Sequence, residues 1–133
     1  MMRGVVNSAL EATVRLSVRN TDARSHEFEA VIDTGFNGFL TLPHALIAAL
    51  RVPWLYRQQG QLADGSLQIF DVYAATIVWD GQPRVVEVEA GDPQALIGMS
   101  LMQGYELRVH VASGGEVSIR AAPSGEADSG RLE

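Results

Sequence analysis

The segment from residue 30 to residue 40 constrains the fold more than any other part of the chain. Its sequence, AVIDTGFNGFL, joins apolar strand residues to one carboxylate and a glycine-containing turn. Residues 30–32 favour a buried strand, Thr34 can hydrogen-bond locally, and Gly35 permits a tight backbone turn. We therefore expect Asp33 to end a buried strand at the rim of a hydrophobic core.

A carboxylate in that position needs partners, because an ionised group in a core is costly without hydrogen bonds or a compensating charge. No Lys or Arg lies between Glu27 and Leu50. Asp33 therefore requires backbone N–H donors, a shared proton or a charge from a distant part of the chain. By itself the tripeptide Asp33-Thr34-Gly35 is also typical of a turn acid in an ordinary β-sheet.

The composition restricts the class of protein. A chain of 133 residues suits one domain, and it has no cysteine, which excludes disulfides and thiolate chemistry. A net charge of -6, with Lys and Arg scattered, argues against nucleic-acid binding. No apolar run approaches the length of a membrane span, and the N-terminus does not resemble a secretory signal. We expect a soluble, cytoplasmic protein without a membrane partner.

The hydrophobic pattern predicts mainly strands. Residues 12–19 alternate between apolar and polar, and residues 28–32 return with the same period, so a hairpin leads into Asp33. Residues 55–62 and 67–79 form two further strand-like runs around Ala63-Asp64-Gly65-Ser66, where Asp-Gly is a strong hairpin signal. The second run is apolar on both faces, so we expect both faces, Ile69 included, to be covered.

Shorter elements complete the prediction. Strands are expected at residues 39–42, 85–88 and 95–97, and a short helix is expected to begin at Pro43. Residues 99–103 favour a helical turn capped by Gly104. A last hairpin pairs Leu107, Val109 and Val111 with residues 117–119. We assign residues 1–121 to one domain and residues 122–133, which are polar and rich in breakers, to a disordered C-terminal tail.

Three features in order resemble the retropepsin-like aspartic proteases, the single-domain relatives of retroviral proteases (clan AA). They are the strand ending in Asp33-Thr34-Gly35, the hairpin with Asp64-Gly65 at its tip, and Leu96-Ile97-Gly98 before a short helix. The resemblance implies an all-β fold, a small closed acid-protease barrel with one or two short helices. It also implies that Asp33 is catalytic, that Thr34 braces the turn and that Gly35 lets the backbone approach a substrate.

The same resemblance assigns roles to other residues. Phe36 and the flap tip Ala63, Asp64, Gly65 and Ser66 would contact a peptide substrate, and Leu96, Ile97 and Gly98 would support the catalytic turn from behind. Because the family needs two aspartates and this chain has one in a strand context, the implied enzyme is a homodimer. It would be an aspartic endopeptidase without cofactor or metal. Residues 5–10 or 117–119 could supply the dimer contact.

Two alternatives accompany this interpretation. The chain could be a retropepsin-like dimerisation or peptide-binding module with weak or no catalysis, or an unrelated β-barrel with a chance tripeptide. A second tripeptide of the same kind, Asp128-Ser129-Gly130, has no apolar strand leading into it and is not expected to be catalytic. Phe36-Asn37-Gly38 replaces the small residue that usually follows the tripeptide in retroviral members, which alters the expected shape of the cleft beside it.

Overall fold

The computed structural model describes residues 1–91 and 93–123, which form ten strands and one helix. In chain order the elements are β1 (Met2–Val6), β2 (Ala12–Arg19), β3 (Ser25–Ile32), β4 (Leu40–Pro43), α1 (His44–Leu50), β5 (Trp54–Gln61), β6 (Leu67–Trp79), β7 (Gln82–Gly91), β8 (Ala95–Ile97), β9 (Tyr105–Val109) and β10 (Glu116–Ala121).

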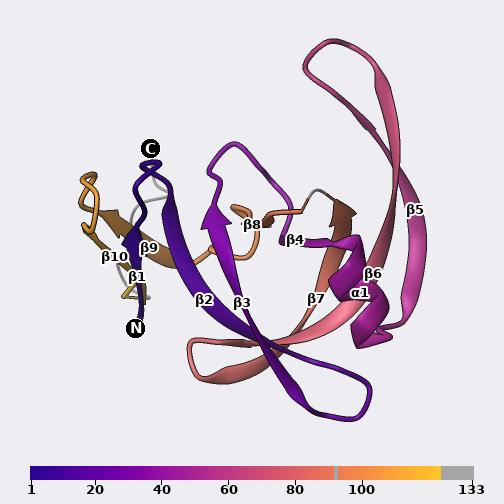
Figure 1. The fold of residues 1–133 in the computed structure, drawn as a ribbon, viewed down its shortest axis with the longest axis horizontal. Coiled ribbons are helices and arrows are strands. Elements are labelled where there is room, and N and C mark those ends of the chain that lie inside the picture. Colours follow the sequence, from indigo (N-terminus) through magenta and orange to yellow (C-terminus); the bar gives the residue numbers. More distant parts are fainter. Residues whose placement is uncertain (92, 124–133) are drawn as a thin grey trace.

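A closed barrel of six strands forms the centre of the molecule. The strands follow one another in the order β6, β7, β4, β8, β3 and β2, and the ring closes because β6 also pairs with β2. Only two pairings in the ring are parallel, β3 with β8 and β4 with β7. The predicted class, an all-β closed barrel with one or two short helices, is confirmed, and the described residues contain one helix (Figure 1).

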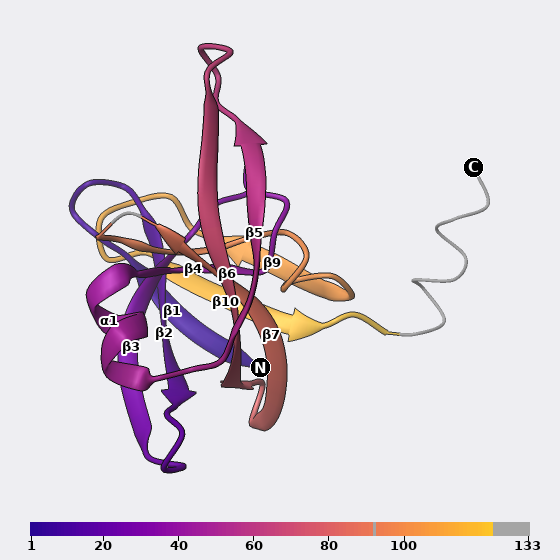
Figure 2. The ribbon, with the colours of Figure 1, turned by 90° about the vertical axis from the view of Figure 1, so that its right-hand side faces the viewer.

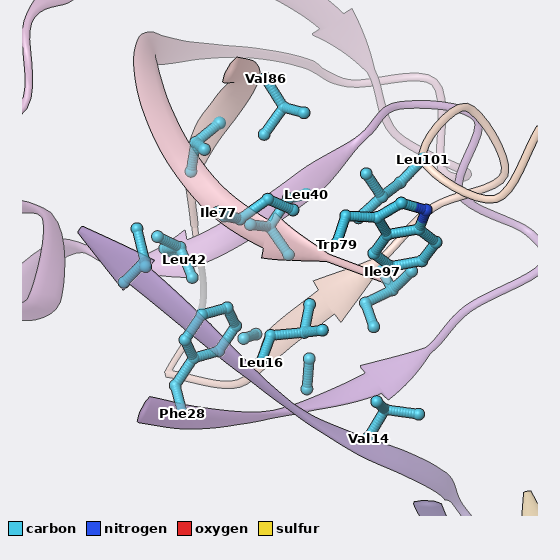
Figure 3. Close-up of a cluster of buried hydrophobic side chains, with 14 of the residues drawn as sticks. Val14, Leu16, Phe28, Leu40, Leu42, Ile77, Trp79, Val86, Ile97 and Leu101 are labelled. Carbon is cyan, nitrogen blue, oxygen red and sulfur yellow. The ribbon is translucent and has the colours of Figure 1, made fainter. Parts of the chain in front are cut away.

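The barrel is filled by the inward residues of its strands. Leu40, Leu42, Ile77 and Ile97 are fully buried, and Trp79 closes one end against Leu101 (Figure 3). Aliphatic side chains of this size each contribute roughly 1.5–3 kcal/mol when removed from water. The ring of Trp79 meets the ring of Tyr105 edge to face, with centroids 5.5 Å apart. The core therefore fixes the positions of the strands that carry the candidate site.

A second group of strands, β1, β10 and β9, continues the sheet beyond β2. The predicted last hairpin is confirmed in its register, since Leu107 pairs with Ile119 and Val109 with Val117. Strand β1 was not predicted. It lies between β2 and β10, so neither β1 nor β10 has a free backbone edge for strand pairing with a second chain. Within the described residues, β9 ends the sheet on this side.

The β5–β6 hairpin extends from the barrel at the opposite end of the sheet order (Figures 1 and 2). The part of β6 inside the barrel is covered as expected, with Ala75 and Ile77 buried. The prediction fails for the outer part, where Leu67 and Ile69 are 65% and 66% exposed. Among the described residues, this half of the strand pairs only with β5, and no second layer covers Leu67 and Ile69.

Several boundaries differ from the predicted ones. Helix α1 begins at His44, with Pro43 in an extended conformation as its N-cap. Residues 99–104 form turns, with Gly104 at φ +86°, rather than an α-helix. Strand β9 ends at Val109, and Val111 is 68% exposed instead of paired. Most of the predicted tail, residues 124–133, and the tripeptide at Asp128 lie outside the described residues. No helix of residues 1–91 and 93–123 is long and apolar enough to cross a membrane.

Candidate active site

Asp33 follows β3 directly, and its backbone extends the pairing of that strand with β8. Its N–H donates to the carbonyl oxygen of Ile97 at 2.9 Å, next to the parallel pair formed by Ile32 and Ile97. Ile97 is fully buried, whereas the aspartate is partly exposed. The carboxylate is therefore presented to solvent from a backbone that is anchored in the core.

The turn after the strand orients the carboxylate. Oδ1 of Asp33 accepts a hydrogen bond from the N–H of Gly35 at 2.9 Å, and the carbonyl oxygen of Asp33 accepts one from the N–H of Phe36 at 3.1 Å. A Cβ atom on Gly35 would lie only 3.3 Å from Oδ1. Oδ2 has no hydrogen-bond partner within the described residues. One carboxylate oxygen is thus fixed by the turn, and the other can interact with a second group.

The segment after β8 holds the loop that follows the turn. The N–H groups of Met99 and Ser100 donate to the carbonyl oxygens of Phe36 and Gly38, at 2.8 and 3.1 Å. Gly98 is buried, and its N–H donates to Phe39 O at 3.0 Å. Any Cβ atom at Gly98 would lie 2.1 Å from the carbonyl oxygen of Gly38. The close approach of the two loops therefore requires glycine at position 98.

Phe36 packs against backbone rather than projecting freely into solvent. Its ring lies within van der Waals reach of both Gly38 and Gly98, since a Cβ atom on either glycine would meet the ring at 2.6 Å. The side chain is half-buried. The ring of Phe36 fits here because residues 38 and 98 are both glycines and have no side chain in its way.

Leu96 and Val31 provide apolar surface beside the aspartate. They pair across β8 and β3, and both are partly exposed. The N–H of Leu96 donates to Oγ1 of Thr41 at 3.0 Å, which binds β8 to β4 at this point. Since side chains alternate along a strand, Val31 and Asp33 lie on the same face. The structure thus brings Leu96, Ile97 and Gly98 against the turn at Asp33, with Leu96 on its solvent side.

The predicted flap tip is a tight turn that is bonded within itself. Oδ1 of Asp64 accepts hydrogen bonds from the N–H and the hydroxyl of Ser66, at 2.9 and 2.6 Å, and these bonds lower the pKa of the Asp64 carboxyl. Gly65 has φ +86°, as the turn requires. Ala63 and its neighbours are exposed. In Figure 1 the tip stands apart from the loop that joins β3 to β4.

Thr34 is exposed, and its hydroxyl makes no hydrogen bond within the part of the chain that the structure describes. Its role in bracing the turn stays a prediction. An exposed hydroxyl beside Asp33 is available to a second molecule, so any such brace would have to involve a partner or a substrate.

The sequence reasoning missed a polar group at the edge of the site. Glu89 on β7 is half-buried, and its Oε2 lies 2.7 Å from the place that a Cβ atom on Gly38 would take. Burial, followed by the charge of Glu87, raises the pKa of the Glu89 carboxyl. The signal was present, because acids at 87 and 89 alternate with apolar residues in the segment that became β7.

An open cavity lies away from the turn at Asp33. It measures about 610 Å³ and lies over β1, β10 and β9, where it is lined by Arg3, Arg108, Arg120 and the buried Ser118. Two arginines there are already paired, Arg3 with Glu116 and Arg120 with Glu106. The cavity shares no residue with the turn at Asp33. Within residues 1–91 and 93–123, no three His, Asp or Glu side chains are grouped to hold a metal ion.

Comparisons with known proteins agree with this architecture. No family model matches the sequence, and no curated protein matches it. Among solved structures, the fold is similar to that of a retropepsin-like aspartic protease from Rickettsia conorii, with a TM-score of 0.57 and 14% sequence identity. The similarity covers 92% of this chain and 91% of the other. The protein therefore has the retropepsin-like fold.

Proposed function

We propose that the protein is an aspartic endopeptidase that acts as a homodimer, with one Asp33 from each subunit. The observation that carries the proposal is the state of the Asp33 carboxylate, in which Oδ1 is held by Gly35 and Oδ2 is unpartnered within the described residues. The similarity in fold to a retropepsin-like aspartic protease supports the same assignment. The cytoplasmic location expected from the sequence remains part of this proposal.

The chemistry requires a second acid. Two carboxylates about 3 Å apart cannot both ionise, so they share one proton. The ionised one takes a proton from a water molecule that attacks the peptide carbonyl, and the protonated one donates to the developing oxyanion. Collapse of the tetrahedral intermediate breaks the C–N bond, and a proton passes to the leaving amine. Each such proton transfer contributes roughly 10²- to 10⁴-fold in rate.

The test is the substitution Asp33→Asn. Asparagine keeps an oxygen that can accept from Gly35, so thermal unfolding should be unchanged, while kcat/KM for peptide cleavage should fall by about 10³-fold or more. Asp22→Asn, in the exposed loop between β2 and β3, is the matched control and should retain full activity. Cleavage that persists in the Asp33 variant would refute the assignment.

Mixed dimers test the shared site directly. When wild-type and Asp33→Asn subunits are exchanged at a fixed total concentration, only dimers with two aspartates are active. Activity should therefore follow the square of the wild-type fraction. A linear dependence would mean that each chain carries a complete site.

The second candidate is a peptide-binding module of the same fold with little or no catalysis. The exposed apolar side chains of the β5–β6 hairpin favour peptide contact without requiring any chemistry; they include Trp54, Leu62, Leu67 and Ile69. Peptide binding by both wild type and Asp33→Asn, with no cleavage by either, would support this candidate.

A further inference from the structure

Glu89 lies on the same face of the barrel as the candidate catalytic residue. Across the strands, Val31 pairs with Leu96, Leu96 with Thr41, and Thr41 with Glu89. Paired residues in neighbouring strands point to the same face of a sheet, and Asp33 shares the face of Val31, two residues before it. A single row of side chains therefore leads from the catalytic turn to this carboxylate.

An open cavity lies at the end of the row. It has a volume of about 150 Å³, and its lining includes Thr41, Gln68, Phe70, Glu89 and Leu96. Gln68 and Phe70 belong to β6, the second strand of the proposed flap. Thr41, Leu96 and Glu89 belong to β4, β8 and β7, the barrel strands beside the turn at Asp33, which we call the floor. The cavity thus lies where the outer part of β6 faces the floor, next to the row.

The carboxylate in this cavity lacks a cation. None of the ion pairs formed by the described residues involves Glu89. Its neighbour Glu87 is already engaged, because the hydroxyl of Tyr56 donates to Oε1 of Glu87. A half-buried carboxylate without a partner is disfavoured in its charged form, so an incoming cation would be stabilised by it.

We propose that Glu89 selects a Lys or Arg side chain of the peptide substrate at a position near the bond that is cut. This inference rests on the proposed function. The aromatic ring of Phe70, which lines the same cavity, can contact the aliphatic stem or the charge of such a side chain.

The position of the basic residue follows from strand geometry. Three steps between neighbouring strands separate Val31 from Glu89, and at about 4.8 Å per step they span at most ~14 Å. An extended peptide covers about 3.4 Å per residue. The basic residue should therefore lie within about four positions of the scissile bond.

The experiment begins with a peptide whose cleavage site has been located by mass spectrometry. Lys, norleucine and Glu are placed in turn at each of the four positions on either side of that site, and kcat/KM is measured. At one position Lys should exceed norleucine by roughly tenfold or more, as expected for a charge-assisted contact in a partly desolvated site. Glu89→Gln should remove this preference, and Glu89→Lys should favour Glu instead.

Glu87→Gln is the matched control. It makes the same change in charge two residues away on the same strand and should leave the preference for Lys intact. Loss of the preference in both variants would indicate a general effect of negative charge and would overturn the inference. Equal cleavage of all peptides by wild type would also overturn it, while leaving the proposed endopeptidase in place.

A binding measurement separates the remaining outcomes. Fluorescence anisotropy with Asp33→Asn protein compares the Lys and norleucine peptides in the absence of cleavage. If wild type cleaves nothing but binding still favours Lys through Glu89, the proposed catalysis fails and the selectivity stands. If neither cleavage nor a binding preference is found, both proposals are rejected.

Discussion

The floor around Asp33 and the β5–β6 hairpin are built in opposite ways. In the floor, backbone groups of β8 and of residues 98–100 bond directly to the turn at Asp33 and to the loop after it. Side chains beneath the turn, such as Leu40 and Ile97, are completely buried. The chain alone therefore determines the geometry of the floor.

The outer part of the hairpin is held mainly by pairing between its own two strands. At its base, Trp54 and Arg57 donate to the carboxylate of Asp71, at 3.0 and 3.2 Å, and these bonds lower the pKa of that carboxyl. Toward the tip, large apolar side chains such as Ile69 are exposed. The two regions therefore differ in how far contacts within the described chain hold them in place.

The largest expected contrast between the two regions is between two glycines. Gly98→Ala should destabilise the fold by about 3 kcal/mol or more, because the new Cβ atom would lie 2.1 Å from a backbone oxygen of Gly38. Gly65→Ala meets nothing within 4 Å and should cost only about 1 kcal/mol, from its positive φ. Urea unfolding of both variants measures the difference. Equal losses in the free energy of unfolding would show that the floor accommodates an added Cβ atom as easily as the tip does.

A matched pair of isoleucines tests the same contrast through packing. Ile97→Ala removes a fully buried side chain and should cost about 2–5 kcal/mol. Ile69→Ala alters a side chain that is 66% exposed and should change stability by no more than about 0.5 kcal/mol.

The hairpin variant has a second readout. If the hairpin covers substrate, Ile69→Ala should raise KM in spite of its normal stability. An unchanged KM would remove this residue from the binding surface, and a large loss of stability would mean that the hairpin packs against the chain more than its exposure indicates.

The floor was also the more predictable region. Alternation over residues 12–19 and 28–32 identified β2 and β3, and the residues around Asp33 specified the turn, because local backbone preferences and the period of the strands determine both. The Asp64-Gly65 turn was found for the same reason. Each of these features is encoded within a few neighbouring residues.

Features that depend on distant pairing were missed. Strand β1 is short and contains Gly4, and it exists because β2 and β10 pair with it on either side. The exposure of Ile69 follows from where β6 leaves the barrel, which its apolar sequence does not encode. Likewise, the position of Glu89 beside Gly38 depends on the pairing of β7 with β4, so its acid character alone could not place it at the site.

The smallest expected effect concerns two acids whose pKa values shift in opposite directions. In the floor, the pKa of Glu89 is raised by burial and by Glu87, so its contribution to stability is present at low pH and is lost as the pH rises through the raised pKa. Glu89→Gln should therefore raise Tm slightly at pH 7. The free energy of unfolding should rise by less than about 1 kcal/mol, because solvent screens a group this exposed, and the gain should vanish near pH 4.

In the hairpin, the pKa of Asp64 is lowered by its bonds to Ser66, so the order of the tip should persist on acidification until the pH falls through that lowered pKa. Thermal unfolding against pH and NMR titration of the Ser66 amide follow the two groups separately, and shifts in the same direction would contradict the assigned environments.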